Sequence, residues 1–416
     1  MNINAWSYIF LIALFASVLI QWLLTQRHVQ HIGAHRGIVP PAFADKIPLD
    51  AHQRAADYTR AKVRLRLVDS GIAIVLLLIW TLGGGIGLLH SVWQTTGWSP
   101  VWLGTGFMLS ALAIMSLLDL PMDWYRTFGL EQRFGFNKMT AKTFIKDTLT
   151  NALVFLVIGT PLLAVVFWIM LNGGSLWWFY VWLIWMGFSI FMMWAYPAFI
   201  APLFNKFRPL EDAGLRQRIE DLLDRNGFES NGIYVMDGSA RSTHGNAYFT
   251  GLGSNKRIVF FDTLLDELSH EEIEAVLAHE LGHFKCNHIV KRTSLLAGLS
   301  LAGLALLAWL MNTDWFFAGL GVETPSVHTA LLLFLLIAPV FMFYLQPVFT
   351  SMSRKHEFEA DDFAASQAHT TNLIQALVKL YKGNANTLTP DPLYSAFHDS
   401  HPPAPIRIAH LQSLAQ

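Results

Sequence analysis

Long apolar stretches separated by polar segments dominate the pattern of hydrophobic and polar positions along this chain. Seven of these stretches have the length that a helix needs to cross a lipid bilayer, about 17 to 25 residues. They lie at residues 8–24, 68–89, 101–120, 152–171, 176–196, 294–311 and 329–348. The pattern therefore predicts a mainly α-helical membrane protein with seven transmembrane helices.

The polar segments divide the chain further. We expect an N-terminal membrane region of five spans with polar loops over residues 1–196, and a polar segment with its own fold over 197–293. Two further spans follow over 294–349, and a C-terminal segment over 350–416 ends the chain.

Shorter patterns predict the elements inside the two polar segments. A helix is expected at 211–226, before a glycine that favours a helix end. Runs of β-branched and aromatic residues predict short strands at 232–236 and 257–262. The C-terminal segment predicts a helix, a loop rich in Asn, Thr and Pro, and a last helix.

Composition and charge support a membrane protein. Hydrophobic residues make up 53% of the chain and charged residues only 14%, whereas soluble domains carry about a quarter charged residues. All 29 Lys and Arg lie in four segments, at residues 25–67, 121–151, 197–293 and 350–416. Positive charge therefore falls on alternate sides of the predicted membrane. The positive-inside rule then places the N-terminus outside and both large polar segments in the cytoplasm.

Two further features limit the class of protein. The net charge of −1 gives no basis for a nucleic-acid partner. The one cysteine, Cys286, excludes an intramolecular disulfide and is expected to be a small packed residue. The compact loops between the spans indicate the inner membrane of a bacterium.

A metal-binding motif follows a predicted helix start. Ser269 and Glu272 form a capping box, and the helix that begins there carries the sequence His-Glu-Leu-Gly-His. His279 and His283 lie on one face of such a helix and can bind one Zn²⁺. Glu280 can act on water as a general base. We therefore expect one zinc ion per chain; a solvated helix whose histidines bind nothing is the alternative.

A catalytic zinc normally has three protein ligands, and an acidic cluster directly after the seventh stretch offers the third. Helical spacing places Glu357 and Asp361 on one face, with Glu359 turned to the other side. Glu357 is the candidate ligand, and Asp361 could accept a hydrogen bond from a ligand imidazole. An acidic, solvated helix start is the alternative, but the charge pattern puts this helix on the same side of the membrane as His279.

Two other segments allow functional and ordinary interpretations. Residues 245–249 precede the second strand and could form an edge strand that holds a peptide, with Asn246 adding an amide contact; a turn is the alternative. His401 and Arg407 follow the acidic cluster and could stabilise an oxyanion; a surface loop flanked by prolines is the alternative.

These motifs, in this order, resemble those of the type I CAAX prenyl proteases. The resemblance rests on residues 279–283, 357–361 and 400–403, and on 246–249 and 256–265. It implies a gluzincin-type site in which His279, His283 and Glu357 bind zinc and Glu280 is the base. It also implies substrate binding by Asn246, Ala247 and Tyr248, catalytic roles for His401 and Arg407, and seven helices that ring a water-filled chamber capped by the catalytic domain.

The leading hypothesis is a membrane-integral zinc metalloendopeptidase that cleaves membrane-associated proteins, including prenylated or lipidated ones. Its partners are then a peptide or membrane-protein substrate and the lipid bilayer, and the oligomeric state is left open. A general quality-control protease shares this chemistry. A transporter with structural zinc would place ionisable residues within its spans, but Asp69, Asp119 and His90 lie only near span ends.

Overall fold

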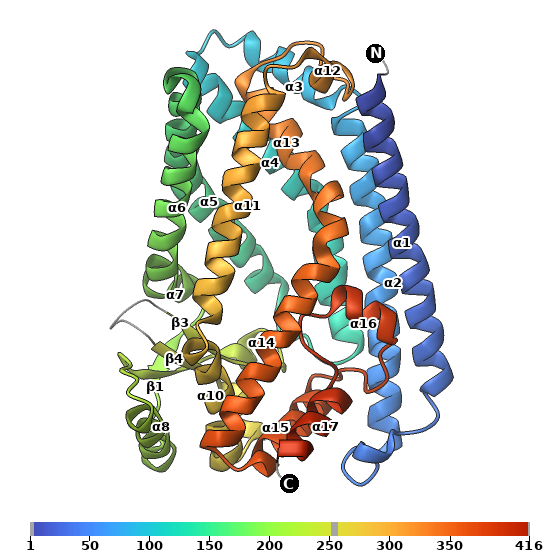
Figure 1. Ribbon diagram of the computed structural model, residues 1–416, viewed down its shortest axis with the longest axis vertical. Helices are drawn as coiled ribbons and strands as arrows, with labels where there is room; N and C mark the ends of the chain where they lie inside the picture. The colour runs from blue at the N-terminus through green and yellow to red at the C-terminus, as the bar shows by residue number, and fades with distance from the viewer. Residues whose placement is uncertain (1–3, 251–256, 415–416) are drawn as a thin grey trace.

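The computed structural model describes residues 4–250 and 257–414. Long helices run along the longest axis of the molecule, and a small sheet with several shorter helices lies at one end (Figure 1). The long helix that begins at Ala5 starts at the opposite end from this sheet. A mainly helical fold with a small sheet was predicted, and it is confirmed.

Within the described residues, the α-helices have the following bounds: α1 (Ala5–His35), α2 (Leu49–Trp80), α3 (Gly85–Gln94), α4 (Pro100–Trp124), α5 (Ala141–Asn172), α6 (Trp177–Ala195), α7 (Ala201–Phe204), α8 (Ala213–Arg225), α9 (Asp262–Glu267), α10 (His270–Lys285), α11 (His288–Leu310), α12 (Asp314–Ala318), α13 (Val327–Met342), α14 (Gln346–Gln367), α15 (Thr370–Gly383), α16 (Pro392–His398) and α17 (Ala404–Leu414). A π-helical segment, Tyr125–Glu131, extends α4.

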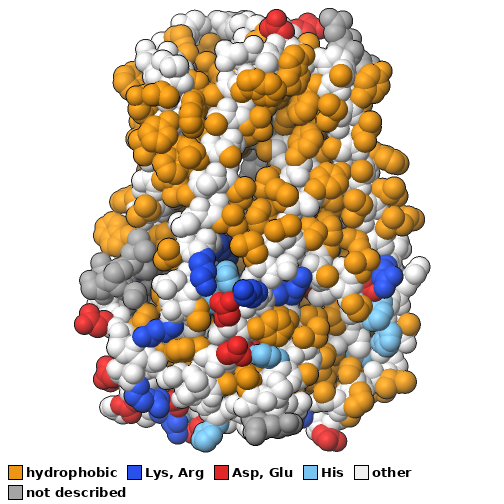
Figure 2. Space-filling model, in the orientation of Figure 1, with side chains coloured by type: hydrophobic (Ala, Val, Ile, Leu, Met, Phe, Trp, Pro, Cys, Tyr) orange, Lys and Arg blue, Asp and Glu red, His pale blue; other side chains and the backbone are white. Residues whose placement is uncertain are grey.

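The helices confirm a multi-pass membrane protein. In the part of the chain that the structure describes, six helical segments are long and apolar enough to span a membrane: Ala5–His35, Pro100–Glu131, Ala141–Asn172, Gly174–Phe204, His288–Leu310 and Val327–Gln367. The pair α2 and α3 passes the same test only jointly. Hydrophobic side chains cover most of the upper face, and charged side chains gather toward the lower end (Figure 2). The count of seven spans, the orientation, the bacterial membrane, the chamber and the four-part division of the chain stay predictions.

The predicted continuous helix over residues 68–89 is wrong, because the chain bends there by 52°. α2 ends at Trp80 and α3 begins at Gly85. Gly84 between them has a φ of 78°, in the left-handed region that glycine adopts without steric cost. A Cβ on Gly83 would lie 2.8 Å from the carbonyl oxygen of Ile79. The backbone therefore turns too tightly here for a side chain at position 83, and this tight turn produces the bend.

The polar loop expected over residues 25–67 is also largely helical. α1 continues to His35 and α2 begins at Leu49, because both extensions have apolar neighbours to pack against. On α2, Tyr58 and Val63 are buried, and Val63 packs in one cluster with Leu24 and Val29 of α1. The basic side chains of α2 are therefore carried on a packed helix.

The sheet contains β1 (Phe207–Pro209), β2 (Ile233–Met236), β3 (Ala247–Thr250) and β4 (Arg257–Phe261), in the order β1-β2-β4-β3. β2 and β4 are parallel, whereas β1 and β3 run antiparallel to their neighbours. The two strands and the helix predicted in this segment are present, and Asp212 caps the helix, α8, by accepting from the backbone N–H of Leu215. β3 is an edge strand, as one interpretation of residues 245–249 required.

The C-terminal segment contains more helices than predicted, because α15, α16 and α17 follow α14. The predicted loop contains α16, which Asp391 caps by accepting from the backbone N–H of Tyr394 at 2.9 Å. Pro392 occupies the first position of this helix, where its missing N–H costs nothing. These helices fold back onto α14 and form one side of the site described below.

One hydrophobic core holds the sheet and the helices at the lower end together. Its central side chains include Ile219 of α8, Phe260 of β4 and Ile273 of α10, all fully buried. The polar face of α10 is therefore turned away from the sheet, toward α14, and Arg407 of α17 also reaches His279 on this face. This packing positions the two histidines of the metal-binding motif.

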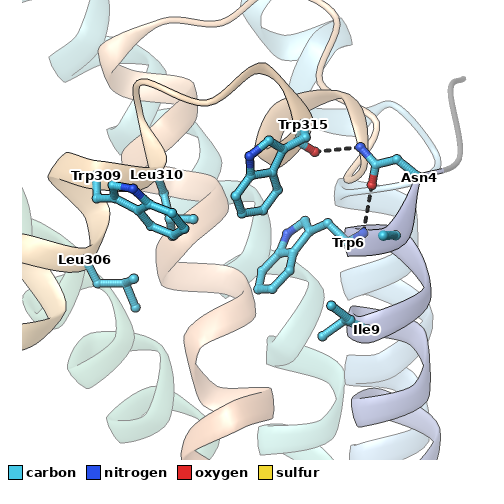
Figure 3. Close-up of a pocket in the computed structure, with 8 residues that line it drawn as sticks. Asn4, Trp6, Ile9, Leu306, Trp309, Leu310 and Trp315 are labelled. Atoms are coloured by element: carbon cyan, nitrogen blue, oxygen red, sulfur yellow. Dashed lines mark hydrogen bonds between the residues drawn. The ribbon is translucent and has the colours of Figure 1, made fainter.

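An aromatic cluster fixes the start of α1 at the other end of the molecule (Figure 3). The Asn4 side chain donates to the Trp315 carbonyl at 2.8 Å and accepts from the Trp6 backbone N–H at 2.9 Å. The rings of Trp6 and Trp315 lie 5.5 Å apart beside an apolar groove of about 500 Å³ that Trp309 also lines. Tryptophan concentrates at membrane–water interfaces, which fits a membrane boundary at this end.

Candidate metal centre and active site

α10 presents both histidines of the predicted motif on one face. The predicted capping box is present: Ser269 accepts from the Glu272 backbone N–H at 3.3 Å, and Glu272 accepts from the Ser269 N–H at 2.7 Å. Lys379 of α15 also donates to the Glu272 carboxylate, at 2.7 Å. The rings of His279 and His283 lie one turn further along, with centroids 5.0 Å apart.

A close approach of α14 to α10 brings Glu357 to these histidines. Gly282 faces Ala360, and a Cβ on Gly282 would lie 2.9 Å from the Ala360 Cα. Only a residue without a side chain allows the two backbones to come this close. The glycine inside the motif therefore sets the distance between the helix that carries the histidines and the helix that carries Glu357.

The three predicted metal ligands form one compact group. His279 Nε2 lies 3.5 Å from one carboxylate oxygen of Glu357, and His283 Nε2 lies 3.5 Å from the other. Tetrahedral zinc with bonds of about 2.0–2.1 Å sets its ligand atoms about 3.3 Å apart. The group therefore has the spacing that a zinc ion requires.

The surroundings of Glu357 also fit a cation. Its carboxylate is buried, and Oε2 makes no hydrogen bond of acceptable angle, although His401 Nδ1 lies 2.7 Å away. A buried carboxylate oxygen without a donor is costly unless a positive group compensates it. Arg407 lies 3.5 Å from this oxygen, and a metal ion between Glu357 and the two histidines would supply further compensation.

Asp361 and Arg407 support His279 from behind. Asp361 Oδ1 lies 2.8 Å from His279 Nδ1, and Arg407 donates to the two oxygens of Asp361 at 2.9 and 2.5 Å. A carboxylate at Nδ1 keeps the proton on that nitrogen and leaves Nε2 free for a metal. Burial and Arg407 lower the pKa of His279, but Asp361 and Glu357 outweigh them and the net shift is upward. The two carboxylates thus stabilise positive charge on the His279 ring.

His288, which no sequence pattern indicated, supports His283 in a similar way. The Nδ1 atoms of the two rings lie 2.9 Å apart, and His288 Nε2 lies 2.8 Å from a Glu359 carboxylate oxygen. When Glu359 accepts from Nε2–H, Nδ1 of His288 can accept from Nδ1–H of His283. This tautomer leaves His283 Nε2 free for a metal. Asn287, with a φ of 57°, makes the turn that brings His288 back toward α10.

Replacing His288 with alanine is expected to weaken zinc binding by about 10- to 100-fold, the range typical of a lost hydrogen-bond partner of a ligand histidine. Competition with a fluorescent chelator measures this affinity. His356→Ala is the matched control, because His356 stacks on His288 with centroids 4.0 Å apart and forms no hydrogen bond to a ligand histidine among the described residues. Equal zinc affinity in His288→Ala and His356→Ala would contradict a positioning role for His288.

A second group of ligand-type side chains lies beside the first. Cys286, His288 and Glu359 each place one such atom within 4.8 Å of the others, so Cys286 has polar neighbours and is not simply packed among apolar ones. The ammonium groups of Lys291 and Lys355 lie 3.6 and 3.9 Å from Glu359. These positive charges oppose a second dication, and the first group is the better metal site.

The other predicted catalytic residues differ in their freedom to contact a substrate. Glu280 is half-buried, and within residues 4–250 and 257–414 its carboxylate makes no hydrogen bond or ion pair. His401 is largely exposed next to Glu357. Arg407 is buried, bound to Asp361, and 3.5 Å from Glu357 Oε2. Glu280 and His401 are thus available to substrate, whereas Arg407 holds other groups in position.

The residues predicted to bind substrate lie at the edge of the sheet. Asn246 is exposed and directly precedes β3, where its side-chain oxygen accepts from the Ala247 N–H at 2.9 Å. Ala247 and Tyr248 pair with β4 on one side. In the described part of the chain no strand pairs with the other side of β3, which suits the addition of a peptide strand.

A motif helix with two histidines, a glutamate from a second helix, and a membrane region of long apolar helices define a membrane metallopeptidase. Residues 28–206 match the family model described as the CAAX prenyl protease N-terminal domain with five membrane helices. Residues 209–415 match the model of peptidase family M48. The chain belongs to the CAAX prenyl protease family of M48 metallopeptidases.

Relatives of known name and structure agree with this assignment over nearly the whole chain. The CAAX prenyl protease 1 homolog of Oryza sativa subsp. japonica is 34% identical, over 92% of this chain and 92% of its own length. CAAX prenyl protease 1 of Saccharomyces cerevisiae is 33% identical, over 94% of this chain and 92% of its own. The crystal structure of S. mikatae Ste24p superposes with a TM-score of 0.90 at 32% identity, covering 99% of this chain and all of that one.

Membership of this family confirms the predicted metalloprotease and the predicted resemblance. It implies a divalent metal, typically zinc, and a protein substrate met at a membrane. The roles of individual residues are proposals, and the contacts described above support them.

Proposed function

We propose that this chain is a membrane-integral zinc metalloendopeptidase that cleaves peptide bonds in membrane-associated proteins, including prenylated or otherwise lipidated ones. His279, His283 and Glu357 bind one zinc ion, and Glu280 is the general base. The proposal rests on the group of three ligand atoms, which have the spacing that zinc requires. Glu280 directly follows the ligand His279, and its carboxylate has no protein partner among the described residues.

The bound zinc supplies Lewis acidity, which lowers the pKa of water and polarises the scissile carbonyl. Glu280 accepts the proton of the attacking water and returns it to the nitrogen of the leaving amine. His401, exposed beside Glu357, donates a hydrogen bond to the carbonyl oxygen as negative charge develops on it. Asp361 and His288 hold the ligand imidazoles in the tautomers that the metal requires.

Asn246, Ala247 and Tyr248 bind the substrate backbone in this proposal. Within residues 4–250 and 257–414, no strand pairs with the outer edge of β3, and an extended peptide can add to this edge as a further strand. An extended backbone also exposes a single peptide bond to the general base, Glu280. Asn246 lies at the end of this edge, where its side-chain oxygen accepts from the Ala247 N–H, and we propose that its amide group also contacts the substrate.

The location of the site supports lipidated substrates. α11 is itself an apolar segment long enough to span a membrane, and α14 belongs to another, Val327–Gln367. A substrate anchored in the bilayer is therefore confined to the region of the site, which raises its effective concentration. Relatives are named CAAX prenyl proteases, and prenyl groups are one such anchor.

Two peptides that differ only in a farnesyl group on one cysteine test this function. The full-length protein in lipid vesicles is expected to cleave the farnesylated peptide with a kcat/KM at least about tenfold higher, as membrane anchoring concentrates it. Mass spectrometry of the products identifies the cleaved bond. Equal cleavage of both peptides would instead favour the second candidate, a general quality-control protease for membrane proteins.

A further inference from the structure

The segment over residues 241–245 leads into β3, and the loop that joins α4 to α5 runs beside it. Asn137 and Ser242 form an isolated antiparallel bridge between the two. The Thr243 backbone N–H also donates to the Phe136 carbonyl, at 3.2 Å. The edge proposed to bind substrate is therefore attached directly to the end of a long apolar helix.

The side chain of His244 strengthens this attachment. Its Nε2 lies 3.7 Å from one carboxylate oxygen of Glu131, the last residue of the π-helical segment that extends α4. The imidazole also stacks on the Phe136 ring, with centroids 4.5 Å apart. The other carboxylate oxygen of Glu131 accepts from the hydroxyl of Tyr58 on α2, at 2.7 Å. One carboxylate thus joins α2 and α4 to the segment before β3.

The opposite side of the His244 ring meets the end of α15. Its Nδ1 lies 3.1 Å from the side-chain oxygen of Asn384, which also accepts from the Gly245 backbone N–H at 3.1 Å. An amide oxygen can only accept, so Nδ1 of His244 carries a proton and donates it. The Thr263 hydroxyl donates to the His244 carbonyl at 3.0 Å. Both the ring and the main chain of His244 are therefore held, two residues before Asn246.

Glu131 and His244 depend on each other for compensation. Among the described residues, the Glu131 oxygen that faces His244 is buried and accepts no hydrogen bond. When Nε2 of His244 also carries a proton, the ring offers this oxygen a donor and a positive charge. Removing one member of a buried polar pair leaves the other without a partner, which costs more than the net value of the pair. Loss of either side chain is therefore expected to release the other.

We propose that His244 and Glu131 are positioning residues for peptide cleavage, and that they hold the outer edge of β3 in a fixed position relative to the metal centre. They act through the main chain of Gly245 and Asn246, not by contact with the reacting atoms. A peptide strand binds more tightly to an edge that is already ordered, because less conformational entropy is lost. This inference rests on the proposed function, because the edge of β3 must bind the substrate for its position to affect cleavage.

The test is a double-mutant cycle in the full-length enzyme in lipid vesicles, with a farnesylated peptide as substrate. Glu131→Leu and His244→Leu should each raise KM about tenfold, the effect of losing one buried hydrogen-bonded contact. The kcat of each variant should stay within about threefold of wild type, since the ground state and the transition state lose the same binding. The double variant should have the KM of either single variant, whereas independent effects would multiply to about a hundredfold.

A conservative variant and a matched control accompany the cycle. In Glu131→Gln the amide can accept from Tyr58 and donate to Nε2 of a neutral His244 ring, so KM should rise by no more than about threefold. Asp57→Leu is the control, because Asp57 lies next to Tyr58 on α2 but pairs with Arg36 of α1 at 2.7 Å. Its KM and kcat should stay within about twofold of wild type. All these variants should bind one zinc ion per chain, which shows that they fold.

Peptides with one N-methylated amide probe the edge of β3 itself. N-methylation removes a donor and blocks strand pairing. In the wild-type enzyme, methylation of an amide that pairs with β3 should lower kcat/KM about tenfold. In His244→Leu the same methylation should cost less than about threefold, because the displaced edge no longer makes that hydrogen bond. A general loss of stability would leave this ratio unchanged.

Three results would overturn the inference and leave the proposed function intact: KM effects that multiply in the double variant, loss of zinc from the single variants, or an equal N-methylation penalty in wild type and His244→Leu. A wild-type enzyme that cleaves no farnesylated peptide would instead overturn the proposed function, and this inference with it.

Discussion

Replacing Glu280 with glutamine is expected to lower kcat by about a thousandfold while the protein keeps its zinc. General-base groups contribute about 10²- to 10⁴-fold, and no other carboxylate in the described cluster is free of protein partners. The neutral amide cannot accept the proton of the attacking water, but it has nearly the shape of the carboxylate. Zinc content by mass spectrometry and cleavage of a lipidated peptide measure the two parts of this prediction.

Glu271→Gln is the control for that variant. Glu271 lies in the first turn of the same helix, exposed and paired with Arg218 at 2.7 Å, so its loss changes the charge of α10 without reaching the metal centre. It should keep both zinc and activity. Full activity in Glu280→Gln would rule out the proposed base.

Replacing Glu357 with alanine is expected to weaken zinc binding by more than about 100-fold. This exceeds the effect of removing a residue that only hydrogen-bonds a ligand histidine. Two histidine ligands would remain, which is fewer than the three protein ligands of a catalytic zinc. Arg407 would also lose the negative charge of its neighbour Glu357, and its positive charge would then oppose a metal ion at the site. Cleavage should fall to the level of zinc-free protein.

Glu359→Ala separates the candidate ligand from its neighbour two residues along. Glu359 contacts His288 and two lysines rather than His279 or His283, so this variant should retain zinc at one ion per chain with only reduced affinity. If Glu357→Ala kept one zinc ion per chain, or if only Glu359→Ala lost its zinc, Glu359 rather than Glu357 would be the third ligand.

The local elements of the catalytic segment follow from short-range patterns, and for that reason they were predictable. The capping box at Ser269 and Glu272 fixes the start of α10 through its own hydrogen bonds, and such contacts span only three residues. The same holds for the i, i+4 spacing of His279 and His283. The strands around residues 232–236 and 257–262 form from side chains with high β-propensity.

The approach of α10 to α14 was predictable only in part. Helical spacing correctly separated Glu357 from Glu359, because the period of a helix determines which face a residue occupies. The backbone contact of Gly282 with Ala360 depends on packing between segments almost eighty residues apart. No local pattern encodes that distance.

Two features needed the folded chain, whereas a third left a visible signal in the sequence. His288 returns to His283 only because Asn287 adopts a left-handed conformation, which helical spacing does not anticipate. Lys62 and Arg66 counted as positive charges of a polar loop, but α2 continues beyond its apolar stretch, since tertiary contacts outweigh local composition. The three glycines at 83–85 were a visible signal for the break between α2 and α3.

The position of zinc in the full-length protein tests the central claim most directly. Crystals of Glu280→Gln loaded with one equivalent of zinc can be measured with X-rays just above and just below the zinc absorption edge. The account predicts a single anomalous peak bounded by Nε2 of His279, Nε2 of His283 and the carboxylate of Glu357. A peak between Cys286, His288 and Glu359, or no peak at either group, would contradict it.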